Sequence, residues 1–356
     1  MTGPTLADPP ELTPVRPGED FDTARVEAYL KQNLSGLKGP MQVLQFPGGH
    51  ANLTYLARFG ERELVLRRPP LGPVAPKSHD MAREYRVLSK LAAHFPPAPH
   101  AYLLCEDLNI MGAIFIVMER RKGIVVRSSI PPELERHPDV SRRISFALID
   151  VMADFHDIDY EKVGLGDLGK PEGYVERQVE GWKGRWERAK DQDLPIFDEM
   201  YTWLVDHMPR SAKPGLVHND LKFDNIMLDP DDPAHVVAIL DWDMTTLGDP
   251  LIDLGTLVCY WAEAGDPEMR GATNALTARP GFPKRAEIAA RYAERRQVDI
   301  STLPWYEAFG LWKTAVVLQQ IYIRYVRGQT QDERFVFLGR QVPLLVELAA
   351  KVAGQA

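Results

Sequence analysis

The sequence predicts an α+β protein in which a strand-rich part precedes a larger, mostly helical part. Five strand-like segments lie in the first third of the chain, at residues 41–46, 53–59, 62–68, 101–105 and 113–118. Helical spacing of apolar residues dominates from residue 140 onward. With 356 residues, the chain is long enough for two compact parts that each bury a substantial core.

The composition is typical of a soluble globular protein. Apolar residues make up 45% of the chain and charged residues 26%, and no apolar run approaches the length of a membrane span. Residues 1–20 are rich in proline and lack the basic and apolar segments of a signal peptide, so we expect a flexible arm. The two cysteines, Cys105 and Cys259, are too few for a disulfide framework or a zinc site, which favours a cytoplasmic location.

The charge of the chain is negative overall but unevenly distributed. A formal net charge of −8 argues against a nucleic-acid partner, which would require a basic surface. Residues 261–356 nevertheless contain 13 Lys and Arg against 10 Asp and Glu, so this region is net positive. We expect a small-molecule partner and no membrane partner, and nothing in the sequence indicates an oligomeric state.

Residues 217–243 contain two acidic groups at the ends of a short hairpin. The apolar runs at 226–228 and 236–240 predict two strands, joined by a turn rich in Asp and Pro. Such a hairpin would bring Asp220, Asn225 and Asp241 to one edge. This grouping suits phosphoryl transfer, which needs a base at the attacking hydroxyl and oxygen ligands for Mg²⁺.

Each of these residues has a predicted role in that chemistry. Asp220 would accept the hydroxyl proton, and Asn225 and Asp241 would hold the metal. Lys222 lies two residues beyond the base, so in an extended loop it points the same way, towards the transferring phosphate. Asp243 would either reach a second metal or form a hydrogen bond nearby. A metal-dependent hydrolase could gather the same residue types, but it would not explain the upstream residues described below.

The stretches His218–Asn225 and Leu240–Asp243 resemble the catalytic and metal loops of the protein-kinase-like superfamily. The Asp-Trp-Asp variant, followed by residues 248–255, is similar to the aminoglycoside phosphotransferase and choline kinase branch. Residues 47–55 and 65–70 carry a finer likeness to the kinase-like domain fused to some acyl-CoA dehydrogenases. The resemblance covers roughly residues 25–345.

The resemblance implies a bilobal protein-kinase-like fold with ATP and Mg²⁺ as cofactors. Residues 21–121 would form a small nucleotide-binding N-lobe with an antiparallel sheet and one main helix. Residues 122–356 would form a larger, mostly helical C-lobe with the catalytic loop and the substrate-binding helices. In this family His218 is a scaffold for the loop, and we assign it no proton transfer.

The resemblance also implies a set of nucleotide-binding residues in the N-lobe. Gly48 and Gly49 would form a turn over the phosphates, although a plain hairpin turn is the alternative. Arg67 stands where the family has a lysine, and arginine can hold phosphate oxygens in a bidentate way. Arg67 and Arg68 could instead be solvated charges at a strand end. The full predicted set is Gly48, Gly49, Asn52, Val65, Arg67, Glu84 and Glu119.

Two members of this set rest on elements further along the chain. Glu84 lies on an amphipathic helix predicted over residues 78–94, where it would pair with Arg67 or simply remain solvated. Glu119 ends the strand after which the family's backbone groups recognise adenine.

Several other residues have structural interpretations. We expect His156, near the end of a helix over 140–158, to cap or pack rather than catalyse. On a helix predicted over residues 174–190, Trp182 and Trp186 lie four residues apart and so share one face. They would either belong to the core or form one wall of a substrate cleft. Asp249 is a natural N-cap for the helix that follows, and Asp253 would brace the catalytic loop.

The sequence therefore predicts an ATP-dependent small-molecule kinase, a phosphotransferase with an alcohol acceptor. Because the C-terminal region is net positive, we expect an anionic or neutral hydroxylated metabolite, and the resemblance suggests a hydroxyacyl compound or its CoA thioester. Aminoglycoside or choline phosphorylation is the first alternative. A catalytically silent nucleotide-binding module is the second, and a protein kinase is disfavoured because no Ala-Pro-Glu segment follows Asp241.

Overall fold

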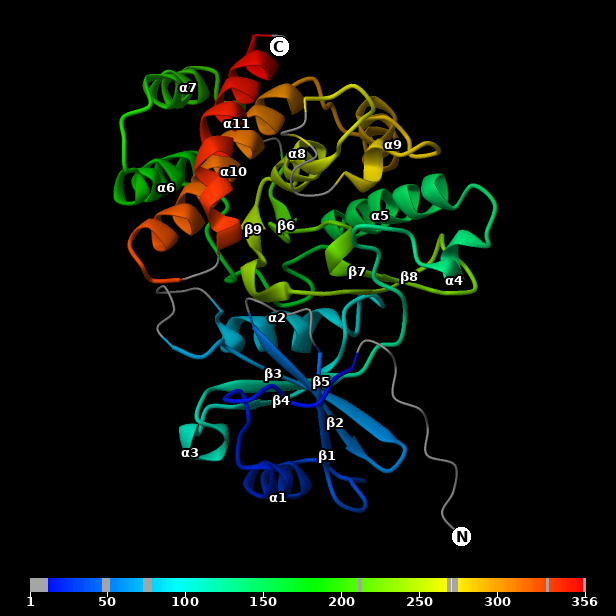
Figure 1. Cartoon of the computed structure of the whole chain (residues 1–356). Helices are drawn as coiled ribbons and strands as arrows, with labels where there is room; N and C mark the ends of the chain where they lie inside the picture. The colour runs from blue at the N-terminus through cyan, green and yellow to red at the C-terminus, as the bar shows by residue number, and fades with distance from the viewer. Residues whose placement is uncertain are drawn as a thin grey trace. The chain divides into compact units, whose positions relative to one another are not determined.

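The computed structural model describes residues 12–46, 52–72, 79–210, 213–267, 270, 275–330 and 333–354. The chain divides into two compact units (Figure 1). The first comprises Met1–Lys122 and Val237–Thr245, and the second comprises Gly123–Val236 and Thr246–Ala356. The predicted α+β class is confirmed, since the first unit contains an antiparallel sheet and the second is mostly helical. The predicted division of nucleotide and substrate binding between N-lobe and C-lobe stays a prediction.

The first unit is built on a five-stranded antiparallel sheet with the order β1-β2-β3-β5-β4. The strands are β1 (Gln42–Gln45), β2 (Leu53–Phe59), β3 (Arg62–Arg68), β4 (Ala101–Cys105) and β5 (Phe115–Glu119). Most of these segments are rich in apolar, β-branched or aromatic residues, which favour strands, and β5 is a continuous apolar run. The bounds of β2, β3 and β4 agree with those that the sequence predicts.

Helices cover both faces of this sheet (Figure 1). They are α1 (Thr23–Asn33), α2 (Met81–Leu91) and the short α3 (Leu108–Met111). Leu64 and Leu66 point to the α1 face and join its buried cluster. Val65 and Arg67 therefore point to the opposite face. On that side Arg67 meets a residue of α2, as described below.

Acidic N-caps fix where α1 and α2 begin. Asp22 accepts a hydrogen bond from the backbone N–H of Arg25 at 2.9 Å, and Asp80 accepts one from Arg83 at 3.0 Å. Each cap satisfies a backbone donor that the first helical turn leaves unpaired, which contributes about 1 kcal/mol.

The second unit consists mainly of helices. They are α4 (Pro132–Glu135), α5 (Val140–His156), α6 (Tyr174–Ala189), α7 (Pro195–Asp206), α8 (Leu251–Tyr260), α9 (Arg285–Arg296), α10 (Leu303–Val326) and α11 (Leu338–Ala353). The 3₁₀ segments η1 (Phe223–Asn225), η3 (Leu276–Ala278) and η4 (Glu333–Phe337) lie between them. The short strands β6 (Gly215–Val217) and β9 (Thr246–Gly248) pair antiparallel, and β7 (Ile226–Leu228) follows η1.

The predicted hairpin turn lies between β7 and β8 (Val236–Ile239), and the boundary between the units falls within β8. The backbone N–H of Asp229 bonds to the carbonyl of His235 at 3.0 Å, and its side chain accepts from the N–H of Asp231 at 2.8 Å. The η2 segment (Trp242–Met244) belongs to the first unit.

Helices α8 and α10 approach closely because glycine lies at their crossing. A Cβ atom on Gly255 would lie 2.4 Å from Cβ of Tyr306, and one on Gly310 would lie 3.0 Å from Cβ of Cys259. Neither position has room for a larger side chain. The contact holds α10 against α8, the helix that follows β9. Among the described helices, none combines the length and the apolar character that crossing a bilayer requires.

Candidate active site

The first unit brings together three of the predicted site residues, namely Arg67, Glu84 and Asp241. Nε of Arg67 lies 3.2 Å from Oε2 of Glu84, and the guanidinium also pairs with the carboxylate of Asp241. Glu84 is 1% exposed. The predicted Arg67–Glu84 pair is therefore present. Arg67 is not a solvated strand-end charge, and neither is Arg68, whose buried guanidinium donates to the carbonyl of Met111 at 2.9 Å.

This charge cluster is strongly coupled. Burial raises the pKa of Glu84 to about 7, although the positive charge of Arg67 acts in the opposite direction. Burial also disfavours the Arg67 cation, but the carboxylates of Glu84 and Asp241 outweigh that effect and raise its pKa. Arg67 therefore stays charged and can serve as a fixed cation for an anionic ligand.

Asp243, two residues after Asp241, makes its own contacts within the first unit. Its Oδ2 accepts from Nδ2 of Asn52 at 3.2 Å and lies 3.7 Å from Nδ1 of His79. Burial and the neighbouring charge of Asp241 raise the pKa of Asp243. Asn52 thus binds a protein carboxylate here, and its predicted contact with a nucleotide stays a prediction.

The remaining nucleotide-site predictions are only partly located. Val65 is buried on β3 and pairs with Met118 of β5. Glu119 ends β5, where its carboxylate lies 3.0 Å from Nε of Arg121. Gly48 and Gly49 lie outside the described residues. The nucleotide-binding roles of these four residues stay predictions.

The second unit brings the predicted catalytic residues together. Oδ1 of Asp220 accepts from Nζ of Lys222 at 2.7 Å, and Oδ2 accepts from Nδ2 of Asn225 at 2.8 Å. Nδ2 of Asn225 also reaches the backbone carbonyl of Asp220 at 2.7 Å. Leu221, which lies between Asp220 and Lys222, is 2% exposed. Side chains in this loop therefore point alternately inward and outward, and Asp220 and Lys222 lie on the same side. The carboxylate of Asp220 is therefore held from two directions.

Asp253 on α8 fixes the backbone of this loop, as predicted. Its carboxylate accepts from the N–H groups of His218 and Asn219 at 2.6 and 2.7 Å. Nε2 of His156 also lies 3.1 Å from the same carboxylate, and Nδ1 lies 2.7 Å from the hydroxyl of Tyr292. Burial alone would raise the pKa of Asp253, but its hydrogen bonds, above all that from His156, lower it.

A second brace acts on Asn219, which adopts a left-handed backbone conformation with φ of 70°. Its Oδ1 accepts from the hydroxyl of Tyr174 at 2.7 Å. Asparagine tolerates this conformation better than most residues, and the bond fixes its side chain. No local sequence pattern indicates Tyr174 or Tyr292 as partners, because each lies far along the chain from the group it contacts. His156 is a buried hydrogen-bonding residue, which agrees with its predicted structural role.

The other end of the loop rests on an aromatic cluster. Phe223 follows Lys222, and its ring lies 5.7 Å from the ring of Trp261 and 6.2 Å from that of Phe282. Nε1 of Trp261 donates to the carbonyl of Pro283 at 2.9 Å. These contacts tie the catalytic loop to the segment between α8 and α9.

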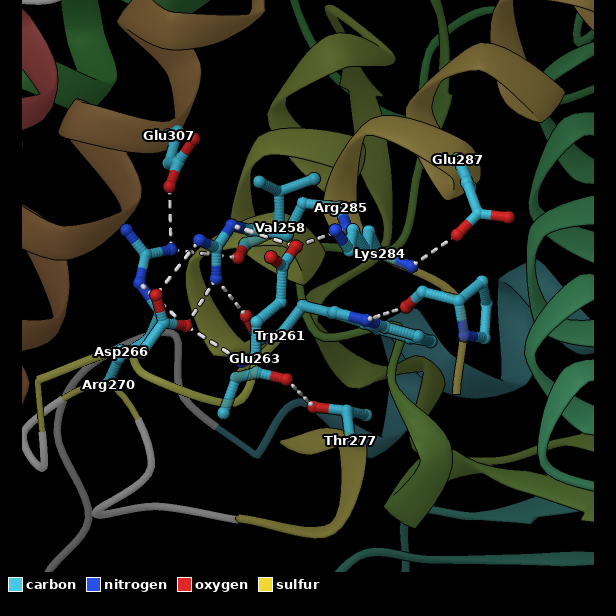
Figure 2. A network of polar contacts seen from close by, with 12 residues as sticks. Val258, Trp261, Glu263, Asp266, Arg270, Thr277, Lys284, Arg285, Glu287 and Glu307 are labelled. Carbon is cyan, nitrogen blue, oxygen red and sulfur yellow. Dashed lines mark hydrogen bonds and ion pairs between the residues drawn. The ribbon is translucent and has the colours of Figure 1, made fainter. Parts of the chain in front are cut away.

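Ion pairs hold that segment in place (Figure 2). Arg285 contacts Asp266 at 2.5 Å and donates to the carbonyl of Trp261 at 2.9 Å. Arg270 pairs with Glu307 of α10 at 2.6 Å and donates to the carbonyl of Val258 at 3.3 Å. The network therefore positions Trp261, which supports the loop.

The end of β9 and the start of α8 are fixed by Asp249. The structure places the helix N-cap at Pro250, one residue after the predicted cap. Asp249 still accepts from the N–H of Leu251 at 3.0 Å, and its second oxygen accepts from the hydroxyl of Tyr306 at 2.6 Å. Its role is structural, as expected.

The buried pair of His156 and Asp253 predicts a loss of stability in mild acid. Burial lowers the pKa of His156, so below its usual value near 6.5 the unfolded chain takes up a proton that the folded chain refuses. Stability should therefore fall from pH 6.5 to 5.5, by at most about 1.36 kcal/mol per pH unit. Urea unfolding across this range should show a flatter pH dependence for His156→Gln. The control His207→Gln, at an exposed histidine of the same unit, should keep the wild-type slope, and equal slopes for all three proteins would contradict the prediction.

Sequence comparison identifies the family. The chain matches the model of the phosphotransferase enzyme family (APH) over residues 42–288. This chain belongs to the phosphotransferase enzyme family. The predicted resemblance is thereby confirmed, and a kinase-type enzyme acting on hydroxyl groups of small molecules is the activity the family supports.

Solved structures agree with this phosphotransferase assignment. A candidate aminoglycoside phosphotransferase from Ralstonia eutropha is 31% identical, with a TM-score of 0.80, and the match covers 95% of this chain and 99% of that one. A thermostable mutant of aminoglycoside phosphotransferase APH(4)-Ia, in ternary complex with AMP-PNP and hygromycin B, is 16% identical. Its TM-score is 0.57, with 90% and 98% of the two chains covered, so that likeness shows the fold alone. The predicted protein-kinase-like fold is confirmed.

Curated relatives of this phosphotransferase are longer proteins. Acyl-CoA dehydrogenase family member 10 of Mus musculus is 33% identical over 343 residues, covering 96% of this chain and 32% of the relative. Acyl-CoA dehydrogenase family member 11 of Homo sapiens is 31% identical over 345 residues, covering 94% and 43%. The chain spans less than half the length of the curated relatives it matches. The predicted likeness to the kinase-like domain of some acyl-CoA dehydrogenases is confirmed.

Proposed function

We propose that this protein transfers the γ-phosphate of ATP to a hydroxyl group of an anionic or neutral small metabolite, with Asp220 as the base. The observation that carries the proposal is the arrangement of the catalytic loop. The carboxylate of Asp220 is oriented by Lys222 and Asn225, at 2.7 and 2.8 Å, and the loop backbone is fixed by a buried carboxylate. An oriented carboxylate on a rigid loop can accept a hydroxyl proton as the oxygen attacks phosphorus.

Lys222 has two roles in this proposal. Its ammonium group neutralises Asp220 in the absence of substrate, at a distance of 2.7 Å. When a phosphoryl group arrives, the same cation can turn towards its oxygens and compensate the charge of the transition state. The side chain of Lys222 is partly exposed and has a flexible stem, so its ammonium group can move from Asp220 to the phosphoryl oxygens.

Asn225 and Asp241 are the proposed metal ligands, and their chemistry fits Mg²⁺. A carboxylate and an amide oxygen are hard oxygen donors of the kind that this ion prefers. Asn225 directs its Nδ2 to Asp220, so its amide oxygen is the atom left for a metal. When bound, Mg²⁺ would compensate the charge of the nucleotide phosphates.

Arg67 is the proposed cation for the nucleotide phosphates, with Glu84 holding it in place. The ion pair of 3.2 Å supports this assignment, because the family pairs a strand cation with a helix carboxylate at these positions. Gly48, Gly49, Asn52, Val65 and Glu119 complete the proposed nucleotide site. Because arginine replaces the usual lysine, a silent nucleotide-binding module remains the alternative that an activity measurement must exclude.

For the acceptor we propose a hydroxyacyl compound or its CoA thioester. Two observations favour it over an aminoglycoside or choline. The C-terminal region, residues 261–356, is net positive, which disfavours a cationic acceptor. The curated relatives are acyl-CoA dehydrogenase family members. The structural likeness to a candidate aminoglycoside phosphotransferase instead favours an aminoglycoside as the acceptor.

A screen of ATP consumption tests the proposed function. Purified protein with Mg²⁺ and ATP is incubated with hydroxyalkanoic acids, their CoA thioesters, kanamycin and choline, and phosphorylated products are identified by mass spectrometry. We expect turnover on hydroxyacyl compounds and none above background on the two cationic acceptors. Efficient kanamycin or choline turnover alone would overturn the acceptor assignment. Mg²⁺-dependent ATP binding by calorimetry with no turnover on any acceptor would favour the silent module.

A further inference from the structure

A buried lysine on α10, which the charge of Asp220 influences, has no carboxylate partner among the residues that the structure describes. Lys313 is 8% exposed. Among the described residues, no carboxylate forms an ion pair with its ammonium group. Burial lowers the pKa of Lys313, while the charges of Asp220 and, less strongly, Asp253 raise it. An ammonium group in this position is costly unless an anion compensates it.

A second buried donor lies next to this ammonium group. Nζ of Lys313 is 5.5 Å from the ring centroid of Trp182, which lies on α6 and is 6% exposed. No acceptor in the described part of the chain reaches Nε1–H of Trp182. The cation–π contact compensates the lysine only in part, and it does nothing for the indole N–H. Buried indole N–H groups normally have a partner, so the pair indicates an acceptor from outside the chain.

The surroundings of this pair are cationic. The guanidinium of the exposed Arg185 lies 4.1 Å from the Trp182 ring centroid. Lys222 lies 5.5 Å from the ring centroid of Tyr260 and bonds to Asp220, so the carboxylate of the base already has a cation of its own. A ligand that brings a negative charge would therefore be stabilised here, whereas a cationic ligand would be repelled.

We propose that Lys313 and Trp182 bind an oxyanion of the phosphate acceptor, a carboxylate or a phosphate ester, beside Asp220. The inference rests on the proposed function for the identity of this ligand as the acceptor, and it deepens that function by naming the charge that the acceptor carries. The ammonium group and the indole N–H would each donate one hydrogen bond to the oxyanion. Free hydroxy acids would then bind better than their neutral esters.

Fluorine NMR on 5-fluorotryptophan-labelled full-length protein tests the oxyanion site without nucleotide. The chain has seven tryptophans, and the Trp182 signal is assigned by its loss in Trp182→Phe. Sodium 3-hydroxybutyrate and inorganic phosphate are titrated separately, with methyl 3-hydroxybutyrate as the neutral probe. We expect a saturable shift of the Trp182 signal with at least one of the two anions and none with the ester. Which anion binds identifies the acceptor group as carboxylate or phosphate.

The variant Lys313→Met keeps the length and apolar stem of the side chain but removes the charge. It should weaken anion binding by about 10- to 100-fold, the effect of losing one charge-assisted hydrogen bond, and Lys313→Arg should restore much of it. Lys351→Met, on the exposed surface of α11, is the matched control and should bind as wild type. Circular dichroism and thermal melting establish that each variant is folded. No shift with either anion, or equal affinity for wild type and Lys313→Met, would overturn the proposal.

Kinetics separate this inference from the proposed function. For a hydroxy acid that the enzyme phosphorylates, Lys313→Met should raise KM for the acid and leave KM for its methyl ester unchanged. An equal change for both substrates would overturn the assignment to the acceptor's oxyanion. If the protein phosphorylated nothing, the NMR titration would still decide whether the oxyanion site exists.

Discussion

Asp220→Asn should lower the turnover number of phosphoryl transfer by about 10²–10⁴-fold, the usual contribution of a general base. The substitution keeps the shape of the side chain and one oxygen for Lys222, but it removes the basic carboxylate and the oxygen that accepts from Asn225. Nδ2 of Asn225 keeps its bond to the backbone carbonyl of residue 220. Binding of Mg²⁺ and ATP should change little, because the nucleotide contacts proposed above lie on other residues. Steady-state kinetics with a phosphorylated acceptor give the turnover number, and calorimetry gives the affinity for the nucleotide.

Asp224→Asn is the matched control for Asp220→Asn. Asp224 lies four residues further along the same loop, within η1, and in the described part of the chain its side chain has no hydrogen bond or ion pair. Its variant should keep wild-type turnover. A similar loss in both variants would mean that any change of charge in this loop impairs the enzyme, and full activity of Asp220→Asn would exclude Asp220 as the base.

The sequence was most informative where the chemistry is local. Asp220, Lys222 and Asn225 lie within six residues, so the spacing of one loop decides which side chains meet. The pair of Arg67 and Glu84 is 17 residues apart, and it could be predicted only because the family resemblance supplies the strand and helix that connect them. Alternation along β3 directs Arg67 away from Leu64 and Leu66 and towards Glu84 of α2.

Other parts of the site could not be predicted because nothing in the local pattern marks them. Tyr174 contacts Asn219 from 45 residues away, and His156 contacts Asp253 from 97 residues away. Lys313 lies in a helix that is apolar on almost every side, where a single lysine is ordinarily assigned to the solvent. Its position beside Asp220 follows from how α10 packs against α6 and α8. The strands β6 and β9 have three residues each, too few to show alternation.

The second large effect is expected from Asp253→Asn. Wild-type Asp253 accepts three hydrogen bonds, from two backbone N–H groups and His156, and an asparagine offers one oxygen in place of two. Its amide nitrogen would face at least one donor, so we expect a loss in the free energy of unfolding on the order of 3 kcal/mol. Urea unfolding measures this loss. Turnover per folded molecule should also fall about 10²-fold, because the backbone beside the base would no longer be fixed.

The pH dependence of this effect follows from the lowered pKa of Asp253. Its stabilisation is fully present above the pKa of an unfolded aspartate, near 3.9, and is lost as the pH falls through the lower folded value. The stability difference between wild type and Asp253→Asn should therefore be constant from pH 7 to about 5 apart from the contribution of His156, and should shrink in stronger acid.

Asp249→Asn separates loop positioning from general stability. Asp249 is also buried on the approach to α8 and accepts two hydrogen bonds, but from Leu251 and Tyr306 rather than from the catalytic loop. Its variant should lose stability as Asp253→Asn does and yet keep its turnover per folded molecule. If both variants lost turnover in proportion to stability, Asp253 would be one more structural carboxylate. A selective loss in Asp253→Asn, with the affinity for ATP unchanged, would establish that it positions the base.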